Sequence, residues 1–358
     1  MKKSQLILAA AALVALASCS GLEPVNQTQD NEIGFNAVTR VATRANDAII
    51  SGAAYATDNT FKVWGWQSPA ADFSEFADDA ASNFMTNLTI EWTKGRDNTR
   101  AEAWRNASDY YYWPFTGRIS FLAIHPSTVA PTTTGWDATN DKPTATINDY
   151  TVSGKDSTDL MFATNEGARQ STALPMVFKH ALSQIQFRVR TDYDYTQDGV
   201  EFKVDSVIIK NIDLSGDVAY ANEAISWTDN AAQTETWAYN KTVKEVAYAA
   251  DDASADLYGR ALVMIPQDKN PDDPATTAVI EGTTITIGYT MKQKDYAPIS
   301  GTVTVAAPWA NSSAAAIPGW EAGKKYNYTL CFKLNEITFN PTVTDWVVVD
   351  VQTINILD

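Results

Sequence analysis

The chain has 358 residues, of which 43 are acidic and 27 are basic, so its formal net charge at pH 7 is −16. This acidic excess argues against a nucleic-acid-binding protein, because binding to the phosphate backbone requires a basic surface, and it favours solubility outside the cell instead. A chain of this length exceeds what one hydrophobic core usually serves, so two domains are expected.

Residues 1–19 have the pattern of an export signal. Two lysines precede an apolar run from Leu6 to Ala17, which is too short to cross a membrane as a helix. The run ends in Leu-Ala-Ser-Cys19, which resembles the bacterial lipobox, in which the cysteine is acylated and becomes the first residue of the mature protein. We therefore predict a secreted lipoprotein that is anchored by a lipid carried on Cys19. An ordinary signal peptide with an incidental cysteine is the alternative.

The segment 20–44 is a polar tether with one candidate strand near its end. Ile33, Phe35 and Ala37 alternate with small or polar residues, which is the pattern of a strand with one buried face. Two arginines follow in a polar stretch that a protease could reach: Arg40, which precedes Val41, and Arg44, which precedes Ala45.

Period-two alternation recurs through the rest of the chain and predicts further half-buried strands. They cover 61–63, 119–123, 185–189, 285–291, 303–305 and 326–334. Polar stretches rich in turn residues separate them, which favours all-β sandwiches over a parallel α/β sheet. We place the domain boundary near Pro175 to Ala181, because Leu174-Pro175 interrupts the pattern. The two sandwiches would then cover 45–178 and 179–358.

The sequence offers little catalytic or metal-binding chemistry. Its two histidines, His125 and His180, lie outside the usual zinc spacings, and a Gly-x-Ser-x-Gly elbow is absent from the sequence. A Ser-His-Asp arrangement is spatial, so sequence alone leaves it open, but a structural role is favoured for both histidines. The segment Asp192 to Gly199 resembles a calcium loop, yet its spacing fits a hairpin turn closed by Asp198-Gly199 better. We predict no catalytic residue, cofactor or metal, and no enzymatic activity.

Aromatic residues cluster in the first half and permit two interpretations. They could form a platform on which sugars stack, or they could fill the core and shield the edges of a sandwich. Core packing is favoured, and a surface glycan-binding lipoprotein remains the alternative function. The residues concerned are Trp64, Trp66, Trp104, Tyr110, Tyr111, Tyr112 and Trp113.

Several stretches, taken in order, carry a family resemblance that none carries alone. They are the lipobox, Ile33-Gly-Phe35-Asn-Ala37-Val-Thr-Arg40-Val-Ala-Thr-Arg44-Ala45, Phe61-Lys-Val-Trp64-Gly-Trp66, Tyr112-Trp113-Pro114 leading into Ile119-Ser-Phe121-Leu-Ala123, Phe178-Lys-His180-Ala-Leu182-Ser-Gln-Ile185-Gln-Phe187, Pro318-Gly-Trp320-Glu-Ala-Gly323-Lys-Lys-Tyr326-Asn-Tyr328 and Trp346. Together they cover almost the whole chain, which resembles the fimbrillin-like type V pilins of Bacteroidetes.

The resemblance implies two tandem transthyretin-like, Greek-key β-sandwich domains delivered to the outer membrane as a lipoprotein. It implies that an Arg-specific protease cuts near the start of the first domain. The excised segment, here with Ile33, Phe35 and Ala37, had filled a groove, and a strand from another subunit replaces it. The product is a cell-surface fimbria of pilin subunits, serving adhesion to a host or bacterial surface ligand. Cleavage after Arg44 is favoured over cleavage after Arg40, because small Ala45 hinders a protease less than β-branched Val41.

The C-terminal tail is a candidate donor strand. Val347, Val349 and Val351 share one face, and the phase then shifts to Ile354 and Ile356, which suggests a bulge or two short strands. The tail could equally be the last strand of its own domain, and the sequence leaves both interpretations open.

Overall fold

The computed structural model describes residues 31–39, 55–74, 76, 81–96, 98, 101–153, 157–229, 235–239, 244–246, 255–256, 261–268, 283–306, 319–333 and 336–345. These residues form β-strands and a 3-10 helix, so the predicted all-β class is confirmed. Within the described ranges, no helix is long and apolar enough to span a membrane. Cys19, Arg40, Val41, Arg44, Ala45, Val347, Val349, Val351, Ile354 and Ile356 lie outside them.

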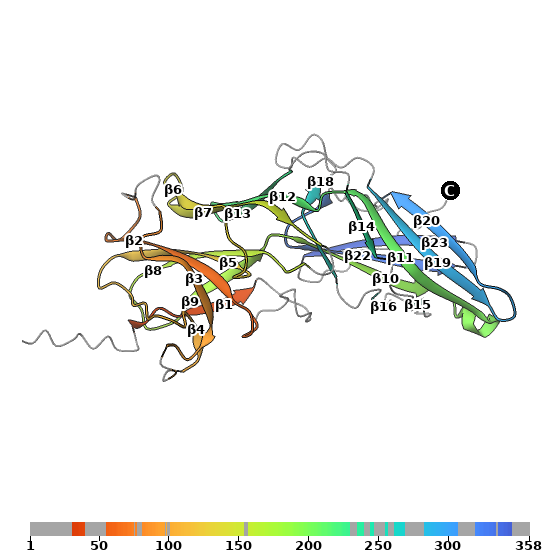
Figure 1. Ribbon diagram of the computed structural model, residues 1–358, viewed down its shortest axis with the longest axis horizontal. Coiled ribbons are helices and arrows are strands. Elements are labelled where there is room, and N and C mark those ends of the chain that lie inside the picture. Colours follow the sequence, from red (N-terminus) through yellow and green to blue (C-terminus); the bar gives the residue numbers. More distant parts are fainter. Residues whose placement is uncertain are drawn as a thin grey trace, which may run out of the picture.

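The first half is built on a closed sheet of seven strands (Figure 1). In sheet order these are β1 (Phe35–Thr39), β4 (Ala103–Arg105), β3 (Met85–Thr93), β2 (Phe61–Ser68), β5 (Arg118–His125), β8 (Met161–Gly167) and β9 (Leu174–His180). The parallel pair of β9 and β1 closes the path. The sheet therefore encloses its own hydrophobic interior.

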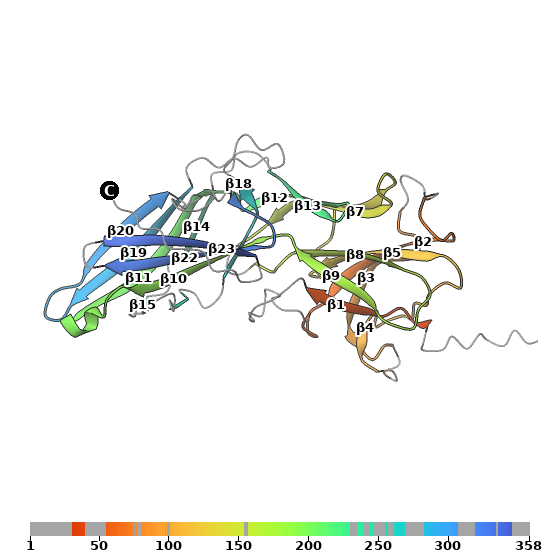
Figure 2. The same cartoon turned by 180° about the vertical axis from the view of Figure 1, so that it is seen from behind.

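A second sheet joins the two halves of the sequence. Its order is β13 (Ala224–Asp229), β12 (Ser215–Ala221), β7 (Lys142–Thr151) and β6 (Thr133–Asp137). Val218 of β12 is the register partner of Ile147 in β7, so strands from both sides of residue 178 share this sheet. The predicted division at residues 178 and 179 does not anticipate this pairing. Figure 2 shows the second sheet reaching from the first half towards the C-terminal strands.

The remaining strands form two further sheets in the second half, with a short two-stranded sheet beside them. One contains β16 (Ala255–Asp256), β10 (Ser183–Thr191), β22 (Lys324–Lys333) and β23 (Glu336–Asp345), with β17 (Leu262–Met264) also paired to β10. The other contains β14 (Glu235–Tyr239), β11 (Val200–Ile212), β19 (Thr284–Gln293) and β20 (Ile299–Ala306), with β15 (Lys244–Val246) also paired to β11. The short sheet pairs β18 (Gln267–Asp268) with β21 (Gly319–Trp320).

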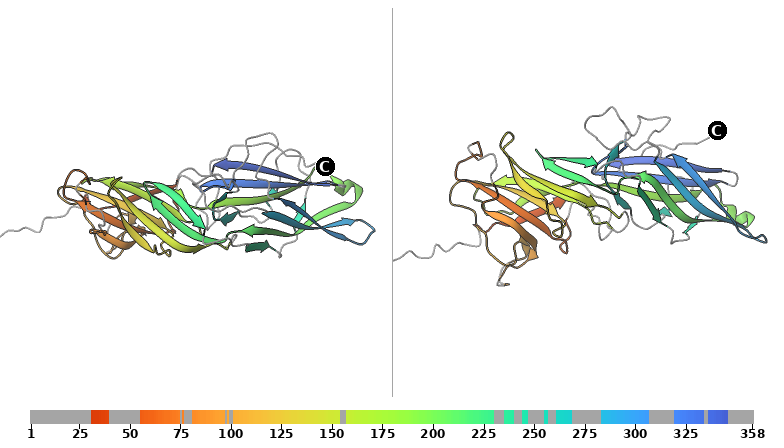
Figure 3. Two further views of the ribbon diagram at one scale, coloured as in Figure 1. Left: turned by 90° about the horizontal axis from the view of Figure 1, so that it is seen from above. Right: turned by 45° about the horizontal axis from the view of Figure 1, so that its top comes forward.

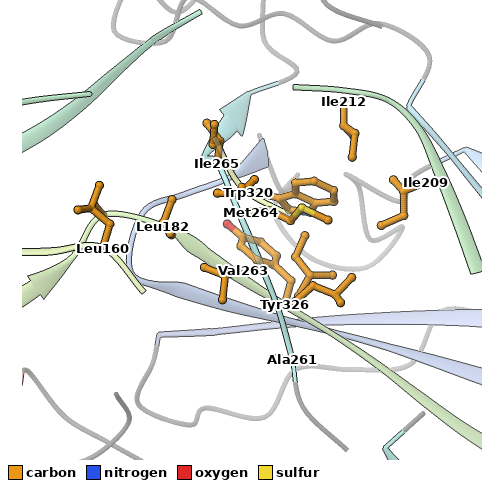
Figure 4. Close-up of a cluster of buried hydrophobic side chains, with 14 of the residues drawn as sticks. Leu160, Leu182, Ile209, Ile212, Ala261, Val263, Met264, Ile265, Trp320 and Tyr326 are labelled. Atoms are coloured by element: carbon orange, nitrogen blue, oxygen red, sulfur yellow. The ribbon is translucent and has the colours of Figure 1, made fainter. Parts of the chain in front are cut away.

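Two hydrophobic clusters hold the described residues together, and they do not divide between the halves. One fills the closed sheet and includes Phe35 and Phe121. The other runs from Trp66, on the outer face of β2, through the second sheet to Phe332 in β22. Figure 4 shows its central part, where Trp320, Tyr326 and Met264 converge with Leu182 and Ile209. Seen from other sides in Figure 3, the two halves lie end to end in one elongated molecule.

Two local predictions are wrong. Leu174-Pro175 does not interrupt the pattern but begins β9, where proline is tolerated near a strand's start. The segment ending at Gly199 is not a hairpin turn, because it links β10 in one sheet to β11 in another. Residues Tyr195–Asp198 form the 3-10 helix η2, capped by the Asp194 side chain and ended by Gly199 in the left-handed region at φ 71°.

The one-face burial predicted for two strands also needs correction. In β10 and β22, the alternate polar side chains are buried as well as the apolar ones. Gln184, Gln186, Asn327 and Thr329 all lie in the interior. Alternation identified these strands correctly, but it did not show that both of their faces are covered.

Candidate functional site: the groove occupied by the first strand

Strand β1 is bonded along both edges. On one side it runs parallel to β9, with register partners from Phe35 and Leu174 to Thr39 and Phe178. On the other side Phe35 is the partner of Trp104 in β4. The residues just before β1 continue this second edge, since the Ile33 amide donates to the Tyr111 carbonyl at 2.8 Å. Removal of this segment would therefore expose two unpaired strand edges.

The inward side chains of this segment fill the closed sheet. Ile33, Phe35 and Ala37 are buried, whereas Asn36 between them is exposed. The Phe35 ring meets Phe121 edge-on, with ring centroids 5.3 Å apart. The alternation predicted from the sequence is therefore present as a strand with one buried face. The groove that this segment occupies is lined by apolar side chains of the surrounding strands: Phe61, Trp104, Trp113, Phe121, Leu174, Met176 and Phe178.

An ion pair fixes the outer end of the segment. Glu32 accepts from Nη1 of Arg105 at 2.9 Å, and both side chains are close to fully buried, with exposed fractions of 6% and 11%. Beside this pair, Nε of Arg169 donates to the Asn31 side chain at 3.1 Å. The sequence does not predict this pair, because Glu32 and Arg105 are distant in the chain and belong to no motif. The only hint of this pair in the sequence is the position of Glu32, directly before the alternating strand.

A buried polar group lies at the inner end, where β9 leads towards β10. The Tyr55 hydroxyl and Nδ1 of His125 are 2.6 Å apart, and the Tyr55 ring stacks on Phe178. Nearby, Nδ1 of His180 lies 2.6 Å from Oδ2 of Asp159. Burial lowers the pKa of His125 to about 4, so its ring is neutral at neutral pH. Burial, together with the charge of Asp159, raises the pKa of Tyr55.

This group has the properties of a structural element. Both histidines lie in the interior, on β5 and β9, where His125 contacts the buried Tyr55 and His180 contacts the buried Asp159. Among the described residues, no cluster of three or more metal-ligating side chains is found.

Tyr55 also shows where the chain resumes after residues 40–54. Phe178 contacts it and also pairs with Thr39, so the two described residues flanking 40–54 meet at one place on β9.

The aromatic residues do not form one exposed platform. Trp64 and Trp66 face the second sheet, whereas Trp104 and Trp113 lie in the interior of the closed sheet, and all four are buried. The three tyrosines from 110 to 112 are only partly buried on the segment that pairs with residues 31–33. The interpretation of these tryptophans as core residues is confirmed.

Comparison with known proteins identifies the family of the chain. A model of fimbrillin-like proteins matches residues 39–346. Fimbrium subunit Fim1C of Phocaeicola vulgatus is 24% identical, with 96% of each chain covered. A fimbrial protein of Bacteroides vulgatus has a similar fold, with a TM-score of 0.59 at 18% identity over 88% of this chain and 100% of that one. A Bacteroides ovatus protein described in terms of cell adhesion gives a TM-score of 0.52 at 16% identity, over 89% of this chain and 99% of that one. The chain belongs to the fimbrillin-like family.

Proposed function

We propose that the protein is a structural subunit of a cell-surface fimbria, assembled by strand exchange after proteolysis. The observation that carries this proposal is the position of β1. It pairs with β9 along its whole length and with β4 at Phe35, its apolar side chains fill a groove, and the next residues in the chain contain Arg40 and Arg44.

The energetics of the groove support exchange. Burial of Ile33, Phe35 and Ala37 contributes about 4–6 kcal/mol, at roughly 25 cal/mol per Å² of apolar surface. This is enough to hold the segment while it is covalently attached. Cleavage after Arg44 removes the attachment, so a donor strand with a longer apolar face can displace the segment.

The remaining steps follow the family plan. The chain is exported through residues 1–19, acylated at Cys19 and held in the outer membrane until an Arg-specific protease cuts it. Its two units, 45–178 and 179–358, follow the tandem transthyretin-like arrangement and are joined by the second sheet. The donor is a strand of another pilin subunit, and the tail from Val347 to Ile356 is its candidate in this chain. The fimbria serves adhesion to a host or bacterial surface ligand.

The decisive experiment is the N-terminal sequence of protein recovered from cell-surface fibres, combined with electrophoresis in sodium dodecyl sulfate. We expect a mature chain that begins at Ala45 and a ladder of detergent-resistant polymers. Cys19→Ala should block lipid labelling and surface delivery. Assembled fibres that keep acylated Cys19 and the segment 31–39 would refute the proposal. Glycan binding is not favoured as a second function, because the tryptophans that suggested it are buried.

A further inference from the structure

Arg105 loses its partner when the first strand leaves. Its guanidinium is held in place, since Nη2 donates to the Ala101 carbonyl at 3.2 Å and the side chain passes over Gly95. Among the described residues, Arg105 forms its ion pair with Glu32. Glu91 is the register partner of Arg105 in the pairing of β3 with β4. Glu32 belongs to the segment that proteolysis would remove. Arg105 does not.

The vacated site has a defined chemistry. With residues 31–39 in place the Arg105 side chain is 11% exposed, and a strand that replaces them covers it again. Arg105 then needs a counter-charge, because water reaches it poorly and the donors of its guanidinium are arranged in a rigid fork. Carboxylates match this fork better than amides or hydroxyls do. The pocket of Ile33 is adjacent, because Ile33 follows Glu32 in the chain and is itself buried. The site therefore combines a cation with an apolar pocket one residue away.

We propose that Arg105 is a carboxylate-binding site that selects the incoming strand. This inference rests on the proposed strand exchange and specifies its partner. The strand that replaces residues 31–39 carries an aspartate or glutamate next to the side chain that fills the Ile33 pocket. Strands with an amide at that position leave Arg105 buried without a counter-charge and bind more weakly. Apolar alternation gives the affinity, and the carboxylate sets the register, since a shift of one residue moves it away from Arg105.

The test uses the chain from residue 20 with a specific protease site inserted between Arg44 and Ala45. After cleavage, a labelled peptide of residues 31–39 competes with the cut segment for the groove, beside the same peptide carrying Glu32→Gln. We expect the glutamate peptide to compete better by about tenfold or more, as a charged hydrogen bond implies. Arg105→Gln should abolish this preference, whereas the matched control Glu91→Gln should keep it.

Equal competition by the two peptides on the unaltered groove would overturn the inference, and so would a preference that survives Arg105→Gln. The comparison on the unaltered groove stands even where the Arg105 variant does not fold. A groove that exchanges both peptides without preference still permits strand exchange. A groove that exchanges neither peptide overturns the proposed strand exchange and, with it, the selection by Arg105.

Discussion

Phe35→Ala is the change that tests most directly how strand β1 is held. The Phe35 side chain is 2% exposed, and its ring packs edge-on against Phe121 at 5.3 Å and against Phe61 at 6.2 Å. Truncation of a buried phenylalanine costs about 3–5 kcal/mol, from lost transfer free energy and the cavity left behind. The affinity of the peptide of residues 31–39 for the cleaved protein should therefore fall by about 10²- to 10⁴-fold.

The measurement is a competition assay with labelled peptide, run beside chemical unfolding of the uncleaved variant. The free energy of unfolding of the uncleaved variant should fall by the same amount, because in the uncleaved protein the strand is part of the folded chain. Asn36→Ala is the matched control, since Asn36 is exposed and should change either quantity by no more than about 0.5 kcal/mol. If Phe35→Ala binds as tightly as the unaltered peptide, the apolar groove does not hold the strand and the reasoning is refuted.

Three further predictions concern processing, the tail and pH. Arg44→Ala should leave a longer surface form that retains Ile33 to Ala37, and Edman or mass-spectrometric sequencing reads this directly; a chain starting at Val41 would identify Arg40 as the cleaved residue instead. Deletion of Thr353 to Asp358, or Ile354→Asp, should stop assembly while leaving the melting temperature of the monomer unchanged, and a destabilised monomer would assign the tail to its own domain. Burial lowers the pKa of His125 from 6.5 to about 4, so the unfolded chain takes up the proton first as the pH falls. The contribution of the neutral His125 ring to the free energy of unfolding is complete above pH 6.5. About 3 kcal/mol of it is lost as the pH falls from 6.5 to about 4. The free energy of unfolding of His125→Gln should therefore depend less on pH across this window. An unchanged pH dependence would show that His125 does not take up a proton on unfolding.

Local pattern predicted the strand that matters most. Alternation at Ile33, Phe35 and Ala37 depends only on which side of one strand is apolar, and the structure has that strand with that face buried. Trp64 and Trp66 were likewise placed on one face correctly. What alternation could not show is that β2 has two buried faces. Phe61 faces the interior of the closed sheet, while Trp66 faces the second sheet.

Long-range pairing explains the rest of what the sequence did not predict. The pairing of β12 with β7 joins residues on opposite sides of the expected boundary, and no local composition records it. The ion pair of Glu32 and Arg105 depends on the same kind of information, because it forms only when β1 lies beside β4. The hairpin predicted at Gly199 was wrong for the same reason, because packing decides whether the chain after a turn stays in one sheet or enters another.

The shared second sheet has a mechanical consequence. A bend between the two halves must break the ladder of β12 and β7, whose register partners run from Tyr220 and Ala145 to Ser215 and Thr151. The indole nitrogen of Trp227 in β13 donates to the Ala181 carbonyl at 2.7 Å and so ties this sheet to the segment between β9 and β10. Each molecule therefore behaves as a stiff lever. In the proposed fimbria, flexing would then occur at the joints between molecules, and the curvature would be set by how far one joint can turn.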